Sequence, residues 1–460
     1  MMSKYQTYPE YKKSGNQWIN VLPIDWKVVP LKYLTTGFVK DGPHETPKFI
    51  DEGIPFLSVD GIQNNQLVFN GCRYISLEDH QRYSLKCRPK NGDILLGKAA
   101  SVGKVALVNT DREFNVWSPL AVISPKKTCF SKFIYYALQS TMLQAQCEVY
   151  SNSNTQKNLG MSTIDNLDFV FPSESEAINI TLFLDHETAK IDTLIEKQQQ
   201  LIELLKEKRQ AVISHAVTKG LNPDAPMKDS GVEWLGEVPD HWVISRVKNI
   251  VSRIVDGPHF SPKYVDDGYM FISARNIKVD RWSLDDAKFV SEQDFLEFNK
   301  RVKPEKGDVL LTKGGTTGIA RAVDLEIPFQ VWVHVAVLKT IKTKIDPFYF
   351  AYVLNGSSCY EQSQLSTYGA TNNDLGLSRI AQIILACPPL DEQKVIKDRL
   401  DSKCSKIDDL VTKAQQQVAL MQERRTALIS AAVTGKIDVR NWVAPATSSD
   451  THEAQQEVTA

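Results

Sequence analysis

The 460-residue sequence contains two copies of one unit. A first motif of Ser, Gly, Trp, Pro and Trp at positions 14, 15, 18, 23 and 26 returns at positions 230, 231, 234, 239 and 242, an offset of 216 (230 − 14). The tetrapeptide DGPH at 41–44 returns at 256–259, and the segments around Gly92-Asp93 and Gly307-Asp308 also match. Because self-similarity at a long, fixed period marks a repeated structural unit, we expect two equivalent halves.

Each copy begins with a strand-and-turn-rich part and ends in a long helix. Strand-like segments such as 54–59, 93–96 and 105–108 are separated by Gly, Pro and Asn-Gly, which predicts a mixed α/β (α+β) domain. Ser173 is a candidate N-cap with Glu176 three residues later, and no Gly or Pro follows until after Lys219. The predicted segments are globular domains at 1–172 and 230–388, helices at 173–219 and 389–440, a linker at 220–229 and a polar tail at 441–460 that we expect to be disordered.

Both predicted helices carry heptad-like spacing. The predicted seam consists of Ile191, Leu194, Leu201, Leu205 and Val212 in the first helix and Ile407, Leu410, Met421 and Leu428 in the second. Such a pattern is typical of a short coiled coil, and two equal helices from two equal units can pair antiparallel around a pseudo-two-fold axis. The alternative is that each helix packs only on its own domain.

The composition and motifs give no support for a catalytic site. The segment GKAASVGKV at 97–105 resembles a phosphate-binding loop, but five residues separate Gly97 from Gly103-Lys104 and Val105 follows, so the pattern fails. The seven cysteines never form CxxC, which favours reduced thiols in a cytoplasm and excludes a zinc ribbon. No apolar run reaches transmembrane length.

Basic residues concentrate in the same region of both copies, although the formal net charge of the chain is only −1. Lys and Arg side chains supply most of the sequence-independent affinity for nucleic acid through phosphate contacts. The phosphate candidates are Lys48, Arg82, Lys86, Arg88 and Lys98 in the first copy and Lys263, Arg301, Lys303 and Lys313 in the second. His44 and His259 in the DGPH turns are candidates for either a phosphate contact or a turn cap.

Polar loops supply candidates for reading base edges, because Asn, Gln, Ser and Thr side chains can hydrogen-bond to bases. The candidates are Asn152, Asn154, Thr155 and Gln156, the corresponding Thr371, Asn372 and Asn373, and Arg275 and Asn276, which stand where the first copy has Asp60 and Gly61. We expect positions that diverge inside shared loops to determine specificity. The alternative interpretation of the polar loops is an ordinary Asx-rich turn.

These features closely resemble the specificity subunit of type I restriction–modification systems. The resemblance covers nearly the whole chain and rests on the SGxxW…P…W entry motif, the DGPH turn, the GDxLL segment and the helix ends EKRQAVISHAVTKG and ERRTALISAAVTGKID. It implies two target recognition domains joined by two antiparallel helices and no catalytic activity of this chain. It also implies double-stranded DNA, two methyltransferase subunits and motor-nuclease subunits as partners, with S-adenosylmethionine, ATP and Mg²⁺ bound by those partners.

The resemblance also suggests how the helices act. From Ile191 to His215 a helix spans about 36 Å at roughly 1.5 Å per residue, close to one turn of B-DNA. We therefore expect each domain to read half of a bipartite site while the helices set the spacer and dock methyltransferase subunits. Two alternatives stay open: a coiled-coil scaffold that does not read DNA, and a specificity subunit of a methylation-only system.

Overall fold

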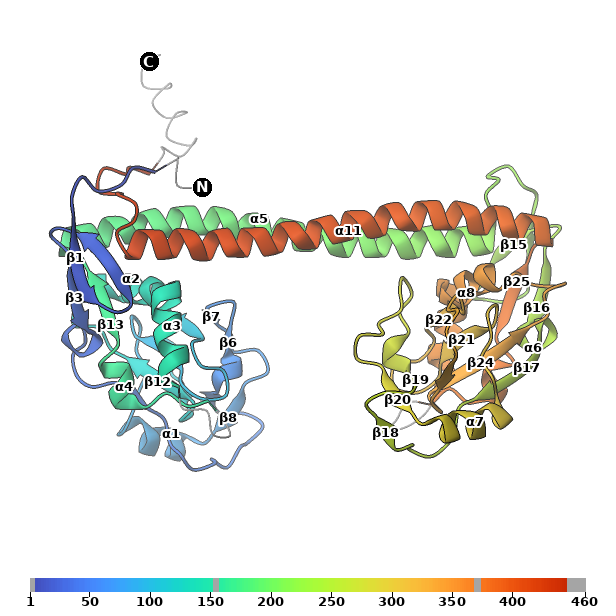
Figure 1. Ribbon diagram of the computed structural model, residues 1–460, viewed down its shortest axis with the longest axis horizontal. Helices are drawn as coiled ribbons and strands as arrows, with labels where there is room; N and C mark the ends of the chain where they lie inside the picture. Colours follow the sequence, from blue (N-terminus) through green and yellow to red (C-terminus); the bar gives the residue numbers. More distant parts are fainter. Residues whose placement is uncertain (1–4, 152–156, 368–373, 445–460) are drawn as a thin grey trace, which may run out of the picture. The chain divides into compact units, whose positions relative to one another are not determined.

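The chain folds into two compact units (Figure 1). This computed structural model describes residues 5–151, 157–367 and 374–444. One unit comprises Met1–Lys197 with Gln417–Ala460, and the other comprises Gln198–Gln416. Each unit therefore contains one copy's globular domain together with parts of both long helices, α5 (Glu174–Lys219) and α11 (Leu390–Val433).

The first globular domain is built around two small sheets. One has the strand order β10-β9-β12-β4 and is antiparallel; the other has the order β11-β5-β8, in which β11 pairs parallel with β5. The strands are β1 (Tyr11–Asn16), β2 (Ile19–Pro23), β3 (Lys27–Pro30), β4 (Lys40–Asp41), β5 (Ile54–Leu57), β6 (Ile62–Gln63), β7 (Gln66–Leu67), β8 (Arg73–Ile75), β9 (Ile94–Gly97), β10 (Val105–Leu107), β11 (Asn115–Val116), β12 (Leu120–Ile123) and β13 (Asp168–Phe171). The helices are α1 (Leu77–Ser84), α2 (Thr128–Gln139), α3 (Thr141–Tyr150) and α4 (Met161–Asp165).

The second globular domain repeats this topology. Its sheets have the orders β22-β21-β24-β17 and β18-β20-β19-β23, so the order of equivalent strands is the same and β18 is added at one edge. Its strands are β14 (Met227–Asp229), β15 (Glu237–Pro239), β16 (Val243–Arg246), β17 (Val251–Asp256), β18 (Tyr264–Val265), β19 (Tyr269–Ile272), β20 (Lys288–Val290), β21 (Val309–Thr312), β22 (Ala320–Ala322), β23 (Phe329–Val331), β24 (Val335–Thr340) and β25 (Ile384–Cys387). Its helices are α6 (Val247–Ile250), α7 (Glu292–Arg301), α8 (Pro347–Asn355), α9 (Ser357–Leu365) and α10 (Leu377–Ile380). The tandem mixed α/β architecture predicted from the repeat is confirmed.

The entry motif of each copy anchors the start of a long helix. Trp26 is fully buried and its Nε1 donates to Glu176 Oε2 at 3.0 Å. The equivalent Trp242 Nε1 donates to Glu392 Oε1 at 3.1 Å. The hydroxyl of Ser173 accepts from the backbone N–H of Glu176 at 3.4 Å, as expected of an N-cap. The carboxylate of Glu176 binds Trp26 instead of completing a capping box.

Each domain core is completed by the end of the other copy's helix. Ile429 and Val433 of α11 lie in the same apolar cluster as Trp26 and Phe133 of the first domain. Ile213 and Val217 of α5 lie in the corresponding cluster of the second domain. The alternative in which a helix packs only on its own domain is therefore wrong.

The two helices run antiparallel within each unit. Arg425 pairs with Asp192 in the first unit and Arg209 pairs with Asp408 in the second, both with an Nε to Oδ1 distance of 2.8 Å. The repeat offset of 216 converts one pair into the other (192 + 216 = 408; 209 + 216 = 425). The helix pair therefore has the same register in both units, as a pseudo-two-fold relation requires.

The predicted seam is correct in part and wrong in phase. Ile191 and Ile407 are buried, and Leu205, Val212, Met421 and Leu428 are partly buried, but Leu194, Leu201 and Leu410 are 49%, 43% and 50% exposed. Ile202, Ile213, Ala414 and Ile429 are also strongly buried. After Ile191, the next side chain that faces the partner helix is four residues on, at Ile195, and not three residues on, at Leu194. The following spacing is three residues. The three exposed leucines lie beside the contact.

Two predicted boundaries also change. Helix α11 ends at Val433 instead of residue 440, because Gly435 adopts a left-handed φ of +71° that terminates a helix readily. The predicted linker 220–229 includes strand β14. In the predicted tail, Trp442 packs edge-on against Phe183 with ring centroids 5.6 Å apart. Residues 445–460 lie outside the described part of the chain.

Candidate nucleic-acid interface

The DGPH turn is a tightly packed corner in both domains. Gly42 lies so close to the backbone of Val116 that a Cβ would overlap with its carbonyl oxygen, and Gly257 has the same relation to Val331. Only glycine fits at these two positions. The turn therefore places the preceding aspartate and the following histidine at a fixed point next to strand β11 or β23.

The aspartate of each turn is a buried carboxylate surrounded by cations. Asp41 lies 2.6 Å from Lys86 Nζ, 3.3 Å from Lys98 Nζ and 3.3 Å from His44 Nε2. Burial alone would raise the pKa of Asp41, but the hydrogen bonds and charges of Lys86 and Lys98 outweigh it and the pKa is lowered. Asp41 therefore carries a negative charge that holds the basic side chains together.

The second domain builds the same cluster. Asp256 pairs with Arg301, with Lys313 at 3.5 Å and with His259 at 3.2 Å. Burial opposes ionisation here too, and the hydrogen bonds from Arg301 and His259 lower the pKa of the carboxyl. Lys313 has an additional partner, Asp374, at 3.0 Å.

This geometry separates the predicted phosphate contacts into two groups. Lys98 and Lys313 are only 7% and 5% exposed, so the prediction that they contact phosphate conflicts with their burial. They stabilise the buried aspartates instead. Lys86, Arg301, His44 and His259 point outward from the same clusters, with side-chain exposures of 50%, 46%, 70% and 62%.

The remaining predicted basic residues are exposed. Lys48 and Lys263 form no ion pair with any described residue. Arg82 pairs with Glu45 and Asp79, both at 2.8 Å, Arg88 pairs with Glu113, and Lys303 lies 4.0 Å from Glu305. Exposed pairs of this kind contribute little to stability, so a phosphate can replace the carboxylate partner at small cost.

The residue that follows each polar loop lies beside the same cluster. The backbone N–H of Leu159 donates to Lys98 O at 2.7 Å, and that of Leu375 donates to Lys313 O at 2.7 Å. The predicted readout residues Asn152, Asn154, Thr155, Gln156, Thr371, Asn372 and Asn373 lie outside the described residues. Their flanking residues connect them to the strand end that carries the buried lysine.

Arg275 and Asn276 have different roles. Asn276 is 1% exposed, and its Nδ2 donates to Ser283 O at 2.8 Å and to Asp286 at 3.1 Å. The prediction that Asn276 reads bases therefore conflicts with its burial, because its polar atoms already hold the turn. Arg275 is exposed and lies 3.5 Å from Asp286.

In the first domain, Asp60 and Gly61 stand at the positions of Arg275 and Asn276. They line a pocket of about 410 Å³ together with Phe49, Arg73 and Trp117. The Nε1 of Trp117 donates to the backbone oxygen of Glu45, just after the DGPH turn. The two domains thus share a scaffold and present different surfaces beside it.

Asp41 and Asp256 organise the two clusters, but neither was among the predicted site residues, which are all basic, amide or hydroxyl side chains. Their exact recurrence inside DGPH was the available signal. Among the described residues, no group of three or more His, Cys, Asp or Glu side chains is arranged to hold a metal ion. Across the same residues, every helix is too short or too polar to cross a membrane.

Comparison with known proteins decides the family. The model of the type I restriction modification DNA specificity domain matches residues 23–205 and again residues 239–420. The chain belongs to this family. It is a specificity subunit, the non-catalytic DNA-recognition component of a type I restriction–modification complex.

Similar proteins match over nearly their full length. The MjaIX specificity subunit of Methanocaldococcus jannaschii is 23% identical over 451 residues, covering 95% of this chain and 99% of that protein. The EcoKI specificity subunit of Escherichia coli K12 is 21% identical over 431 residues, covering 90% of each. A solved chain from a study of complex assembly and conformational transition of the type I system covers 90% of this specificity subunit and 99% of itself, with a TM-score of 0.62 and 15% identity. That likeness supports the fold.

Proposed function

We propose that each recognition domain reads one half of a bipartite DNA site and that helices α5 and α11 set the spacing between the halves. The observation that carries this proposal is the recurrence of the Asp–Lys/Arg–His cluster, on the same strand order, in both units. Two equivalent binding surfaces on one chain suit a site with two parts. Their differences at Asp60 and Arg275 suit two halves of different sequence.

Each cluster suits a phosphate-facing role. The buried aspartate fixes one buried lysine and leaves Lys86 or Arg301 and a histidine at the surface. These outward cations contact the DNA backbone and position the domain, whereas the neighbouring polar loop and the Asp60 or Arg275 region read base edges. Lys48 and Lys263 add further phosphate contacts, and neither lysine has to leave a described carboxylate partner to form them.

Methyltransferase subunits dock on the helix face that lies opposite the recognition domain. Tyr136 donates its hydroxyl to Asp185 at 2.8 Å, and Leu194 follows Asp185 by nine residues. At about 100° per residue, nine residues place Leu194 half a turn round the helix from that contact. Tyr352, Asp401 and Leu410 repeat this relation in the second unit, with a hydroxyl contact of 2.8 Å.

Exposed leucines on this face form what we call the docking face: Leu194 and Leu420 in the first unit, and Leu201, Leu204 and Leu410 in the second. Each is between 43% and 61% exposed. Apolar side chains grouped on one side of a helix are typical of a surface that a partner covers. The partners supply S-adenosylmethionine, ATP and Mg²⁺, and the complex works in the cytoplasm with motor-nuclease subunits.

The test is genome-wide mapping of N6-methyladenine in cells that express this chain with its methyltransferase subunit. We expect one motif with two fixed halves separated by a fixed number of unspecified bases. A methylation pattern that does not depend on this chain would contradict the proposal. Duplex binding whose affinity does not fall with salt would favour the protein scaffold, since a scaffold releases no counterions.

A further inference from the structure

The first recognition domain contains a pocket at a place where the second domain has a packed side chain. The pocket has a volume of about 410 Å³, and its walls include Ser58, Gly61 and Val68. Their counterparts at the local repeat offset of 215 are Ser273, Asn276 and Ser283. Because the chain is duplicated, the second domain shows what the same turn holds when this space is occupied.

The two turns have the same backbone. The N–H of Gly61 donates to Ser58 O at 3.0 Å, and the N–H of Val68 donates to Gly61 O at 2.9 Å. The equivalent hydrogen bonds of the second domain are present at 3.0 Å and 2.9 Å. The polar groups on the walls of the pocket therefore have direct equivalents in the second domain.

In the second domain the carboxamide of Asn276 uses these groups. Its Oδ1 accepts two hydrogen bonds from Ser273, one from the backbone N–H at 2.9 Å and one from the hydroxyl at 2.7 Å. Its Nδ2 donates to Ser283 O at 2.8 Å. The turn therefore binds a flat group in which a carbonyl oxygen stands next to an N–H.

In the first domain the same groups are not engaged. Gly61 brings no side chain, and within the described residues neither the N–H and hydroxyl of Ser58 nor the carbonyl of Val68 forms a hydrogen bond. Ser58 and Val68 are both partly exposed on the wall of the pocket, so a ligand can reach them. Such groups favour a ligand that supplies the missing acceptor and donor.

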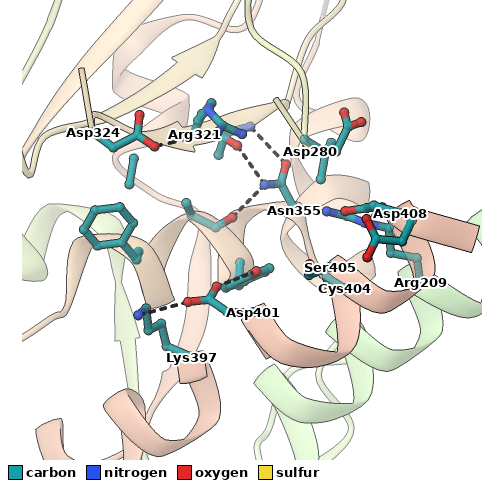
Figure 2. A pocket seen from close by; sticks show the side chains of 17 residues that line it. Arg209, Asp280, Arg321, Asp324, Asn355, Lys397, Asp401, Cys404, Ser405 and Asp408 are labelled. Carbon is teal, nitrogen blue, oxygen red and sulfur yellow. Dashed lines mark hydrogen bonds and ion pairs between the residues drawn. The ribbon is translucent and has the colours of Figure 1, made fainter. Parts of the chain in front are cut away.

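A pocket of the second unit differs in this respect. It has a volume of about 470 Å³, lies beside helix α8 and strand β22, and is lined by charged side chains. Figure 2 shows ion pairs within its walls: Arg209 lies 2.8 Å from Asp408, and Lys397 lies 2.9 Å from Asp401. A ligand would have to displace these ion pairs, whereas Ser58 and Val68 in the first domain are available.

The hydrogen-bonding pattern of the first-domain pocket selects a keto base among the nucleobases. The two donors of Ser58 are placed to share one acceptor, and a carbonyl oxygen has two lone pairs whereas a ring nitrogen has one. Guanine and thymine each carry a carbonyl oxygen next to a ring N–H, which matches the carboxamide of Asn276. Adenine and cytosine offer a ring nitrogen next to an amino group, and so satisfy only one of the two donors.

The other walls of the pocket suit a neutral aromatic ring. Phe49 and Trp117 are partly exposed there, and bases of any sequence stack on aromatic side chains. Arg73, whose guanidinium lies 4.6 Å from the centroid of the Phe49 ring, and Asp60 contribute opposite charges to the same pocket. A neutral base is therefore favoured over a free anion.

The pocket adjoins the proposed phosphate contacts of the first domain. Ser118, which follows Trp117 of the pocket wall, donates from its N–H to Pro43 O in the DGPH turn at 3.2 Å. Lys48, a proposed phosphate contact, directly precedes Phe49 of the pocket wall. A phosphate bound by Lys48 therefore lies beside the pocket that receives the base.

We propose that this pocket holds one guanine or thymine base that leaves the stack of the DNA bound by the first domain. In a paired duplex the N–H next to the keto oxygen is used in base pairing, so the base must turn out of the helix to present both groups. DNA as the source of the base rests on the proposed function; the hydrogen-bonding pattern of the pocket does not. The second domain cannot select a base in this way, because Asn276 fills the equivalent space.

The first experiment measures thymidine binding to the full-length chain by saturation-transfer NMR. The wild-type chain should bind thymidine about tenfold more tightly than N3-methylthymidine, which lacks the ring N–H, or deoxycytidine. Gly61→Asn should weaken thymidine binding at least tenfold, because its carboxamide fills the pocket as in the second domain. Gly61→Ala is the matched control, since its Cβ approaches Leu57 Cδ2 to the same 3.1 Å but leaves Ser58 and Val68 open, and it should retain binding.

Thermal unfolding shows whether the two turns are equivalent. Gly61→Asn should unfold at a higher temperature than Gly61→Ala, because the carboxamide satisfies the polar groups of Ser58 and Val68. An equal or lower unfolding temperature would contradict the equivalence. Absence of thymidine binding by the wild-type chain, equal binding of N3-methylthymidine, or equal binding of thymidine by Gly61→Asn would overturn the pocket assignment.

A second experiment identifies the source of the ligand. Gly61→Asn, assembled with the methyltransferase subunit, should bind a duplex that carries the methylated motif about tenfold more weakly than the wild-type assembly does. The slope of log affinity against log salt should stay the same, because no phosphate contact is lost. Unchanged duplex affinity would overturn the turned-out base, and displacement of thymidine by an equal concentration of N-acetylasparaginamide would assign the pocket to a partner protein's side chain instead. If the wild-type assembly does not bind duplex DNA, the proposed function fails, while thymidine binding still reports on the pocket.

Discussion

Arg425 donates from Nε to Asp192 at 2.8 Å and from Nη1 to Gln139, and so links α11 both to α5 and to the first recognition domain. Within the described part of the chain, the equivalent Arg209 donates a hydrogen bond to Asp408 and to no second side chain. The ion pair between the two helices is therefore present in both units. The hydrogen bond from the arginine to the recognition domain is found in the first unit and not among the described residues of the second.

This difference predicts unequal effects of the two arginines. Arg425→Ala should destabilise its unit by about 1 kcal/mol more than Arg209→Ala does, because one additional hydrogen bond from a charged donor is lost. Amide hydrogen exchange measures the local opening free energy, over the segments 185–197 and 418–433 for Arg425→Ala and over the equivalent segments 401–413 and 202–217 for Arg209→Ala. Thr426→Ala, at an exposed position on α11, is the matched control and should change the local opening free energy by less than about 0.5 kcal/mol. Equal losses from the two arginine variants would contradict the asymmetry.

Asp41 should contribute more to stability than its equivalent. Asp41→Asn leaves the Lys98 ammonium, with a side chain only 9% exposed, without a counter-ion, which costs about 3–5 kcal/mol. Asp256→Asn should cost less, since Lys313 keeps Asp374 at 3.0 Å. Thermal unfolding of the two variants measures the difference. A larger loss for Asp256→Asn would contradict this account of the clusters.

The same carboxylate predicts an acid-dependent stability. The pKa of Asp41 is lower in the folded protein than in the unfolded chain. The free energy of unfolding that ionised Asp41 contributes is therefore fully present above the pKa of about 4 that the residue has in the unfolded chain. It is lost as the pH falls through the lower pKa of the folded state. We expect the stability gap between the wild-type chain and Asp41→Asn to narrow below about pH 4. A gap that stays constant down to pH 2 would show that the charge of Asp41 is not what stabilises the fold.

Exposed and buried lysines should differ in their effects on DNA binding. Lys48→Ala and Lys263→Ala should each reduce the slope of log affinity against log salt by about 0.9, with equal weakening on all sequences. Lys98→Ala should leave that slope unchanged in the fraction that folds, because the buried ammonium faces Asp41. Lys206→Ala on α5, an exposed position paired with Glu203, is the control for loss of one surface charge. Fluorescence anisotropy over a salt series tests all four variants.

The docking face predicts a selective loss of assembly. Leu194→Glu with Leu410→Glu should weaken association with the methyltransferase subunit at least tenfold, since two leucines that are half exposed in the chain alone become buried in the complex. Gln199→Glu with Gln415→Glu, at equivalent exposed positions outside the docking face, adds the same two negative charges and is the control. Sedimentation velocity of the mixed subunits gives the affinity. Unchanged assembly by the leucine variants would remove this face from the interface.

The repeat predicted most of the architecture because its signal is long-range. Matching residues such as Trp26 and Trp242 are buried against matching glutamates, so sequence identity between the copies reported a shared core. The phase of the seam was harder to predict. Leu194 and Ile195 are both apolar, and only the packing of the partner helix and the domain decides which one turns inward.

Burial within the candidate interface could not be predicted from the sequence. A lysine in a basic segment appears the same in the sequence whether it faces solvent, as Lys48 does, or a buried aspartate, as Lys98 does. Likewise, an asparagine side chain such as that of Asn276 can hydrogen-bond to bases, but its Nδ2 already donates to residues of its own turn. Pairing between distant segments, here Asp41 with Lys86 and Lys98, is tertiary information that local composition does not contain.

We propose that the helix pair sets the spacing between the two recognition surfaces. The most direct measurement inserts four residues after Gln200 in α5 and four after Gln416 in α11, which preserves the antiparallel register and adds about 6 Å, nearly 2 bp. N6-methyladenine mapping should then return the same two half-sites with a spacer lengthened by one or two base pairs. The same half-sites with an unchanged spacer would contradict the claim.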